Sequence, residues 1–172
     1  FMIRDVYQKC YERQAAFYRT RPRAKKMLTA GNYALTAAVF VAYALLCLIE
    51  LIVRRKTATQ ADVIRIVGVP LLCLLAVSVL RNLIDRRRPY EREDIDPILN
   101  KKKAGHSFPS RHVASAFVIG VVLLRYAVWA GVLVLLAGIL LGYIRFAAGL
   151  HYPSDLFAGA AFGVLFGLIA FI

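Results

Sequence analysis

Acidic residues and cysteines are scarce in this sequence. Its 172 residues include 10 Asp and Glu against 23 Lys and Arg, which gives a formal net charge of +13. The three cysteines, Cys10, Cys47 and Cys73, include no pair with CxxC spacing. We therefore expect neither a disulfide framework nor a zinc knuckle. The first 26 residues also lack the apolar core of a removable signal peptide.

Apolar residues, by contrast, are abundant. They make up 60% of the chain, above the roughly 45–50% of soluble globular domains. An integral membrane protein is the resulting prediction. The excess of cations would favour nucleic acid as the partner of a soluble protein. In a membrane protein it favours anionic lipid, so we expect the lipid bilayer as partner and no nucleic acid.

Five uncharged runs predict an all-α, polytopic membrane helical bundle of about five transmembrane helices. Several of the runs approach the ~20 residues that cross a bilayer. The second and third runs are short, so these spans are expected to include polar flanking residues such as Arg81 and His112. The runs are 27–49, 66–80, 113–124, 126–144 and 156–172.

The residues before the first run favour an amphipathic helix in the membrane interface, with a solvated basic arm as the alternative. Pro22 is expected to end this helix. We therefore divide the chain into a basic amphipathic interfacial segment, residues 1–26, and a membrane-embedded domain, residues 27–172. The apolar positions that fall near a 3.6-residue period are Ile3, Val6, Tyr7, Cys10, Phe17 and Tyr18.

One connection, residues 81–111, is much longer than the others and holds nine Lys or Arg. Connections of this length are usually functional or disordered. Counting through five spans puts residues 1–26, the 81–111 connection and the 145–155 connection on the same membrane face. The unusual polar segments therefore share one side.

Three arginines in these segments are permanently charged forks suited to bidentate phosphate binding: Arg81, Arg88 and Arg145. Arg81 and Arg88 are seven residues apart. They share a helix face if the second span continues past residue 84 and ends at Pro89.

The segment around residue 110 has the pattern of a helix start. Pro109 and Ser110 precede an apolar run, and Ser110 can cap the helix with its side chain. The backbone N–H groups of such a terminus attract anions. His112 titrates near neutral pH, which suits a general acid. A phosphate-binding site at the mouth of the third span is the prediction.

His151 and Asp155 are four residues apart and share a helix face if Pro153 opens the fifth span. An aspartate beside an imidazole fixes the tautomer and makes the other ring nitrogen a better nucleophile. Such a pair is more often a structural hydrogen bond. The catalytic interpretation depends on the arginines, the serine and the second histidine on the same face.

Together the three segments resemble the signature K-x6-RP, PSGH and SR-x5-H-x3-D of the type 2 phosphatidic acid phosphatase and vanadium haloperoxidase superfamily. The likeness is to its bacterial membrane lipid phosphatases, of the lipid A 1-phosphatase or undecaprenyl-pyrophosphatase kind, and covers the chain from about residue 60 onward. Arg81, Arg111 and Ile144 stand where the signature has lysine, glycine and serine. The matching stretches are Arg81-x6-Arg88-Pro89, Pro109-Ser110-Arg111-His112 and Ile144-Arg145-x5-His151-x3-Asp155.

The resemblance implies a lipid phosphatase that needs no metal and no cofactor. His151, oriented by Asp155, would attack phosphorus and form a phosphohistidine, while His112 protonates the leaving oxygen and later activates water. Arg111 either adds an anion contact or crowds the site. The implied phosphate-binding residues are Arg81, Arg88, Ser110, Arg111 and Arg145.

Among the substrates of similar proteins, lipid A 1-phosphate is preferred here because the first 26 residues and the long connection are basic. Undecaprenyl pyrophosphate, phosphatidylglycerol phosphate and phosphatidic acid remain alternatives, and the oligomeric state is open. The positive-inside rule makes the cation-rich face cytoplasmic. Bacterial relatives place the site on the outer side of the inner membrane, and a phosphate-binding face must itself be basic, so we expect a multi-pass inner-membrane protein with an extracytoplasmic site. The five Lys and Arg on or toward the other face are Arg54, Arg55, Lys56, Arg65 and Arg125.

Other functions remain open. A non-catalytic lipid-phosphate-binding protein with the same fold is the first alternative, and Arg111 favours it. A transporter or channel would carry ionisable residues near the membrane midplane, whereas here they gather at one interface. A vanadate-dependent oxidising enzyme shares the signature but not a membrane-embedded lipid site.

Several polar residues near the signature match none of its positions. His106 is expected to be a loop histidine. The neighbouring cations are either solvated or attract anionic substrate. These cations are Arg86, Arg87, Lys101, Lys102 and Lys103.

Overall fold

The computed structural model describes residues 2–92, 95–99 and 104–172, and the regular structure in these ranges is helical. The predicted all-α class is therefore confirmed. In chain order the helices are α1 (Met2–Thr20), α2 (Pro22–Cys47), the π-helix η1 (Leu48–Val53), α3 (Gln60–Val63), the π-helix η2 (Ile64–Gly68), α4 (Val69–Ile84), α5 (Pro89–Arg92), α6 (Arg111–Tyr126), α7 (Val128–Ala147), α8 (Pro153–Leu168) and the 3-10 helix η3 (Ile169–Phe171).

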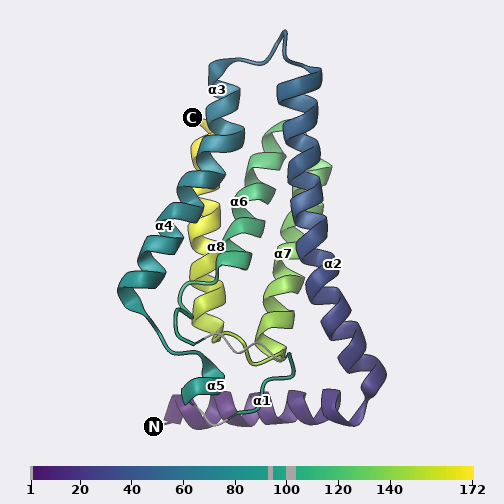
Figure 1. The fold of residues 1–172 in the computed structure, drawn as a ribbon, viewed down its shortest axis with the longest axis vertical. Coiled ribbons are helices and arrows are strands. Elements are labelled where there is room, and N and C mark those ends of the chain that lie inside the picture. Colours follow the sequence, from purple (N-terminus) through teal and green to yellow (C-terminus); the bar gives the residue numbers. More distant parts are fainter. Residues whose placement is uncertain (1, 93–94, 100–103) are drawn as a thin grey trace.

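The long helices α2, α4, α6, α7 and α8 run side by side as a bundle (Figure 1). Helix α6 is the central element, because α8, α7 and α4 all pack against it. Its apolar residues are buried accordingly, with Val118 and Val122 almost completely enclosed. The first turn of α6 is thus held in place from several sides.

A stripe of glycines lets α8 approach α6 closely. Gly159, Gly163 and Gly167 recur every fourth residue of α8 and face α6. A Cβ atom at Gly159 would lie 2.7 Å from the backbone oxygen of Ser110, and one at Gly163 would lie 2.6 Å from that of Ala114. Small residues permit such close helix pairs in membranes. The Gly159 contact fixes α8 directly against the predicted phosphate-binding turn.

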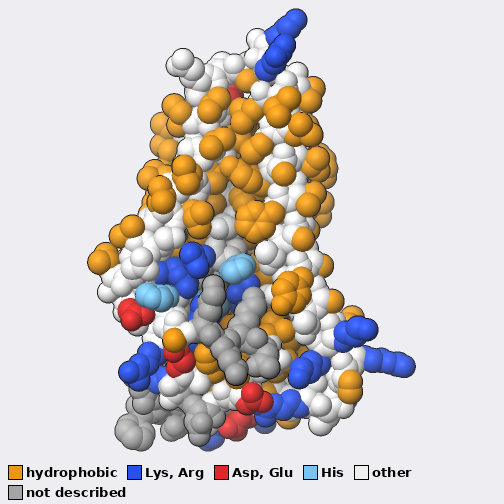
Figure 2. All heavy atoms as spheres, in the orientation of Figure 1, with side chains coloured by type: hydrophobic (Ala, Val, Ile, Leu, Met, Phe, Trp, Pro, Cys, Tyr) orange, Lys and Arg blue, Asp and Glu red, His pale blue; other side chains and the backbone are white. Residues whose placement is uncertain are grey.

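Four helical stretches of the described chain are long and apolar enough to cross a membrane: Pro22–Val53, Gln60–Arg92, Val128–Ala147 and Pro153–Phe171. The second includes a break at residues 85–88. Helix α6 has 16 residues, fewer than the ~20 that a span requires, so the count of five spans remains a prediction. Apolar side chains cover most of the bundle's length, and Lys and Arg gather toward its ends (Figure 2).

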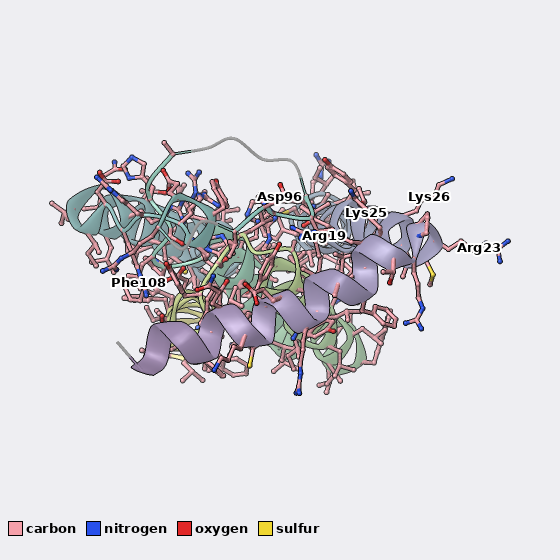
Figure 3. All side chains as sticks on the ribbon, turned by 90° about the horizontal axis from the view of Figure 1, so that it is seen from below. Arg19, Arg23, Lys25, Lys26, Asp96 and Phe108 are labelled. Atoms are coloured by element: carbon pink, nitrogen blue, oxygen red, sulfur yellow. The ribbon has the colours of Figure 1, made fainter. Side chains whose placement is uncertain are left out.

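Helix α1 is the expected N-terminal helix, and it lies across one end of the bundle (Figure 1). Its residues Tyr7 and Tyr11 are buried in a cluster that includes Leu150, from the connection between α7 and α8. Arg19 pairs with the carboxylate of Asp96 at 3.3 Å (Figure 3). The covered end is also where α4 ends and where α6 and α8 begin. The polar segments therefore do gather on one side of the bundle.

The condition under which Arg81 and Arg88 would share a helix face, a second span that continues as helix past residue 84, is not met. Helix α4 ends at Ile84, and Asp85 takes a left-handed backbone conformation with φ of 39°. The Asp85 carboxylate accepts the backbone N–H of His106 at 3.1 Å, which fastens this turn to the loop before α6. Arg88 consequently lies in a connection between α4 and α5, and does not share a helix face with Arg81.

Candidate active site

Two buried arginines bind the three signature segments together through backbone carbonyls. Arg81, from the last turn of α4, donates to the oxygen of Pro109 at 2.7 Å. Arg88 donates to Gly105 at 3.1 Å and to Leu150 at 3.4 Å. Arg88 therefore joins the loop before α6 to the residue that precedes His151. These bonds draw distant parts of the chain to one place.

A backbone hydrogen bond joins the starts of α6 and α8. The N–H of Ser110 donates to the backbone oxygen of Asp155 at 2.9 Å. This bond and the close approach at Gly159 fix the two helix termini relative to each other. The predicted phosphate-binding turn thus lies directly beside the predicted His151 and Asp155 pair.

His151 and Asp155 are both buried and lie side by side. The Nδ1 atom of His151 is 3.5 Å from Oδ2 of Asp155, and that oxygen accepts the Ser107 hydroxyl at 2.5 Å and the Tyr152 N–H at 3.0 Å. The two residues do not share a helix face as predicted, because α8 begins at Pro153, after His151. The carboxylate reaches back from the first turn of the helix to the ring.

The environment of His151 keeps its imidazole neutral. Burial lowers the pKa of His151 to about 4, and the nearby Arg88 and Arg145 guanidinium groups lower it further, while Asp155 opposes the shift. A neutral ring carries one proton. With Nδ1 on the Asp155 and Ser107 side, the proton is assigned to Nδ1 and the lone pair to Nε2.

Two buried side chains offer hydrogen-bonding atoms that the protein does not use. Within the described residues, no partner is found for Nε and Nη2 of Arg145 or for Oγ of Ser110. Ser110 is the N-cap residue of α6, but its side chain makes no capping bond, so the predicted side-chain cap is wrong. Unpaired buried donors are costly, and an anion between these groups would satisfy them.

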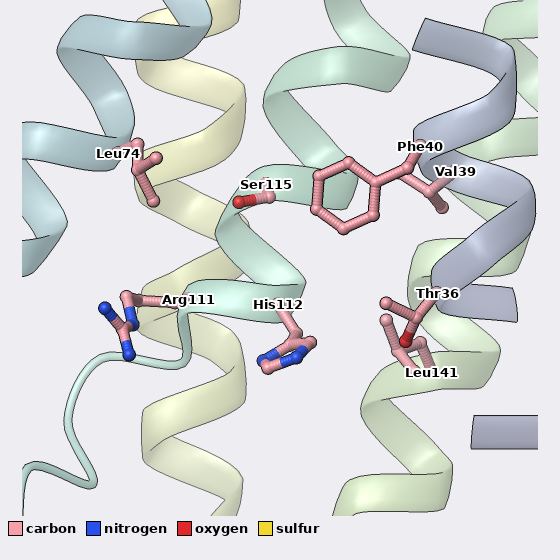
Figure 4. Close-up of a pocket in the computed structure, with 8 residues that line it drawn as sticks. All are labelled: Thr36, Val39, Phe40, Leu74, Arg111, His112, Ser115 and Leu141. Atoms are coloured by element: carbon pink, nitrogen blue, oxygen red, sulfur yellow. The ribbon is translucent and has the colours of Figure 1, made fainter. Parts of the chain in front are cut away.

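The remaining predicted residues line two adjoining cavities. Arg81, Arg88 and Arg111 line a cavity of about 420 Å³. Arg111 also lines an apolar cavity of about 180 Å³ together with His112. Figure 4 shows Arg111 on the side of α4 and His112 on the side of α2 and α7. The site is therefore a buried histidine with an open cationic cavity and an apolar cavity nearby.

The family follows from the sequence around this site. Residues 62–172 match the PAP2 superfamily along their length. The chain belongs to the PAP2 superfamily. This confirms the resemblance drawn from the three segments, and together with the apolar helices it makes the chain a multi-pass membrane protein.

Two curated lipid A phosphatases are similar over about half of the chain. A lipid A 4'-phosphatase of Bacteroides thetaiotaomicron is 38% identical over 93 residues, which cover 50% of this chain and 41% of that protein. A lipid A 1-phosphatase of Rhizobium johnstonii is 37% identical over 106 residues, covering 57% and 42%. The chain thus spans less than half the length of these curated relatives.

Solved PAP2 structures have the same fold. The crystal structure of Aquifex aeolicus LpxE superposes with a TM-score of 0.69 and 28% identity, covering 93% of each chain. A PAP2 type phosphatidylglycerolphosphate phosphatase from Bacillus subtilis superposes with a TM-score of 0.60 over 97% of this chain and 93% of that one. At 18% identity, the latter supports the fold alone.

Arg86 and Ser107 contact Asp155 in this site, and no pattern in the sequence predicts that they belong to it. Arg86 donates to Oδ1 of Asp155 and to the Ser154 hydroxyl, both at 2.8 Å, and its guanidinium lies 4.3 Å from the centre of the Tyr152 ring. Ser107 donates to the other carboxylate oxygen. The sequence predicts only that Arg86 is either solvated or attracts anionic substrate, because nothing local relates it to a residue 69 positions away.

The other polar residues that match no signature position have simpler surroundings. His106 is half exposed, and its Nδ1 lies 3.1 Å from the Arg81 backbone oxygen and 3.2 Å from the Asp85 carboxylate. This agrees with a loop histidine that supports the turn after α4. Arg87 is exposed. Lys101, Lys102 and Lys103 lie outside the described residues.

Proposed function

We propose that this chain is an integral membrane lipid phosphatase that hydrolyses a phosphomonoester or diphosphate of an anionic lipid through a phosphohistidine. One observation carries the proposal. The neutral, buried His151 and Asp155 pair lies beside Arg145 and Ser110, whose buried polar atoms lack partners within the described residues. The His151 and Asp155 pair would supply the nucleophile. The unpaired polar atoms of Arg145 and Ser110 would bind the phosphate anion. The similarity to lipid A phosphatases supports the same class.

In the first step, Nε2 of His151 attacks phosphorus and the bond between phosphorus and the lipid oxygen breaks. His112 donates its proton to that leaving oxygen. The Arg88 and Arg145 guanidinium groups and the Ser110 hydroxyl stabilise the charge on the other phosphate oxygens, where positioned donors have most effect. Asp155 stabilises the imidazole as it becomes positive.

In the second step, a water molecule attacks the phosphohistidine and the phosphorus–nitrogen bond breaks. The neutral His112 accepts the proton from that water, which restores the protonated acid. His151 regains its neutral form and inorganic phosphate leaves. The residues alone carry this cycle, so the proposal includes no metal and no cofactor.

Lipid A 1-phosphate is the first candidate substrate, because the N-terminal segment and the loop before α6 are basic and LpxE is a structural neighbour. We place the active site on the extracytoplasmic face of the bacterial inner membrane. Labelling a cysteine introduced at the exposed Arg87 with a membrane-impermeant reagent in intact cells tests that face. No labelling before cell disruption would contradict the assignment.

The decisive experiment measures phosphate release by purified protein from lipid A 1-phosphate, undecaprenyl pyrophosphate, phosphatidylglycerol phosphate and phosphatidic acid. His151→Ala should abolish release, and His112→Ala should lower it by about 10²–10⁴-fold, the usual contribution of a general acid. Arg87→Gln, at an exposed arginine, is the control and should retain most activity. Release that persists in His151→Ala would reject the nucleophile, and release that stops on adding EDTA would reject the metal-free mechanism.

A lipid-phosphate-binding protein without catalysis is the second candidate. The specific observation behind it is Arg111, a long cation at a position where the signature has glycine. The same assay separates the two functions. Binding of these lipids without release of phosphate, in wild type and in Arg111→Gly alike, would favour the binding protein.

A further inference from the structure

A cationic cavity lies beside the active site, in addition to the place where His151 would meet a phosphate. It has a volume of about 420 Å³ and lies between the end of α4 and the loop before α6. His151, Arg145 and Ser110 are not among the residues that line it. The polar residues that do line it are Ser78, Arg81, Asn82, Arg88, His106 and Arg111.

Arg111 is the cation of this cavity that the protein leaves available. Arg81 and Arg88 donate to backbone carbonyls, which fixes both side chains. Within the described part of the chain Arg111 has no hydrogen bond and no ion pair, and its side chain is exposed. The Arg111 guanidinium group is therefore available to an anion in the cavity. Guanidinium groups bind phosphate with charge-assisted, bidentate hydrogen bonds.

The positions of Arg88, Arg111 and His112 relative to His151 indicate which part of a substrate would carry this anion. Arg88 bonds to the carbonyl of Leu150, next to His151, and also lines the cavity, so it borders both regions. Arg111 also lines the adjoining apolar cavity, which His112 lines from another side (Figure 4). His112 is the proposed donor to the leaving oxygen. A group bound by Arg111 is thus on the leaving-group side, between the transferred phosphoryl and the lipid chain.

We propose that Arg111 forms a subsite for a second phosphate on the leaving group, so that lipid diphosphates are preferred over lipid monophosphates. This subsite would rank undecaprenyl pyrophosphate above lipid A 1-phosphate among the four candidate substrates. The inference rests on the proposed phosphatase function. His151 would take the terminal phosphoryl group, and the bond between the terminal phosphorus and the bridging oxygen would break. His112 would protonate that oxygen, and the product would be a lipid monophosphate held at Arg111. Water would then release inorganic phosphate from His151.

Farnesyl diphosphate and farnesyl monophosphate test the subsite, because they share one chain and differ by one phosphate. The measurement is kcat/KM for phosphate release. Wild type should favour the diphosphate, and Arg111→Gln should lower that preference at least about tenfold, as expected for the loss of a hydrogen bond to a charged group. Arg111→Gly should do the same. Arg87→Gln removes the same charge from an exposed arginine nearby and should leave the preference unchanged.

Equal losses on both substrates in Arg111→Gln, or no loss on either, would overturn the subsite. No phosphate release by wild type from these two compounds or from the four lipids of the panel above would instead reject the proposed function. A binding measurement then decides the subsite alone: His151→Ala protein should bind farnesyl methylenediphosphonate at least tenfold more tightly than farnesyl phosphonate. Adding Arg111→Gln should remove the difference, and a difference that survives would reject the role of Arg111.

Discussion

Replacing Arg86 by glutamine removes the positive charge that holds the Asp155 carboxylate. Arg86 is a positioning residue here, because it touches Asp155 and not the reacting atoms. Its Nη1 atom donates at 2.8 Å to an aspartate that is fully buried, while the arginine side chain is 31% exposed. Without it, Oδ1 of Asp155 loses its charged donor and the carboxylate is free to turn away from His151.

The size of the effect follows from these contacts. A hydrogen bond to a charged group contributes about 1.5–3 kcal/mol, and about 1.4 kcal/mol of transition-state stabilisation corresponds to a factor of ten in rate. Ser107 and Tyr152 still hold the other oxygen at 2.5 and 3.0 Å, so the carboxylate stays in place in part. We expect kcat to fall about 10- to 100-fold in Arg86→Gln, with KM changed little because Arg86 does not touch the substrate.

The assay is steady-state phosphate release in detergent, with pH profiles for each variant. Arg87→Gln is the matched control, since it removes one exposed arginine beside Arg86 and should keep full activity. Arg86→Lys keeps the charge without the fork and should be intermediate. The loss of a positive charge near the pair should also move the acid limb of the profile to higher pH. A kcat within twofold of wild type, or a change confined to KM, would refute this role for Arg86.

Three further outcomes are expected. Because burial lowers the pKa of His151 to about 4, the nucleophile should stay neutral from neutral pH down to that value and be lost below it; an acid limb of kcat/KM near 6.5, assigned by His151 titration, would contradict this. Gly159→Ala should reduce activity about tenfold more than Gly167→Ala, because only its Cβ meets the Ser110 backbone oxygen, at 2.7 Å, and strain of about 1–3 kcal/mol would fall on the site; equal activities would count against it. Tyr11→Phe should lower the melting temperature by about 2–4 °C with kcat unchanged, because it removes the hydrogen bond of about 1 kcal/mol that the Tyr11 hydroxyl donates to the backbone oxygen of Asp96 at 2.6 Å; an unchanged melting temperature would contradict it.

The sequence could predict those features of the fold and the site that depend on residues close together in the chain. Uninterrupted apolar runs predict membrane helices, and they located the helices of the bundle to within a few residues. The contact between His151 and Asp155 was also accessible, because only four residues separate them. The two residues are in contact although they do not share a helix face. Asp155 lies in the first turn of α8, and its side chain reaches back to His151, which precedes the helix.

The turn at Asp85 could not be predicted in this way. A left-handed backbone is unusual for a residue other than glycine, and here His106, 21 positions later, supports it by donating its N–H to the Asp85 carboxylate. No local pattern encodes such a pair. The turn redirects the chain after α4, which is what brings Arg86 to Asp155 and leaves Arg88 between two segments. Arg86 therefore reaches Asp155 from a turn that contacts distant in the sequence support.

The partner of the N-terminal helix α1 also could not be predicted from the sequence. A 3.6-residue period predicts that one helix face is buried but does not say what buries it. In the fold, Tyr7 of that face lies 5.1 Å from the Tyr152 ring, centre to centre, and Arg86 lies over the same ring at 4.3 Å. Tyr152 is therefore packed between α1 and the arginine that holds Asp155. Because packed neighbours fix each other's positions, the N-terminal helix supports the orientation of Asp155 toward His151, the proposed nucleophile.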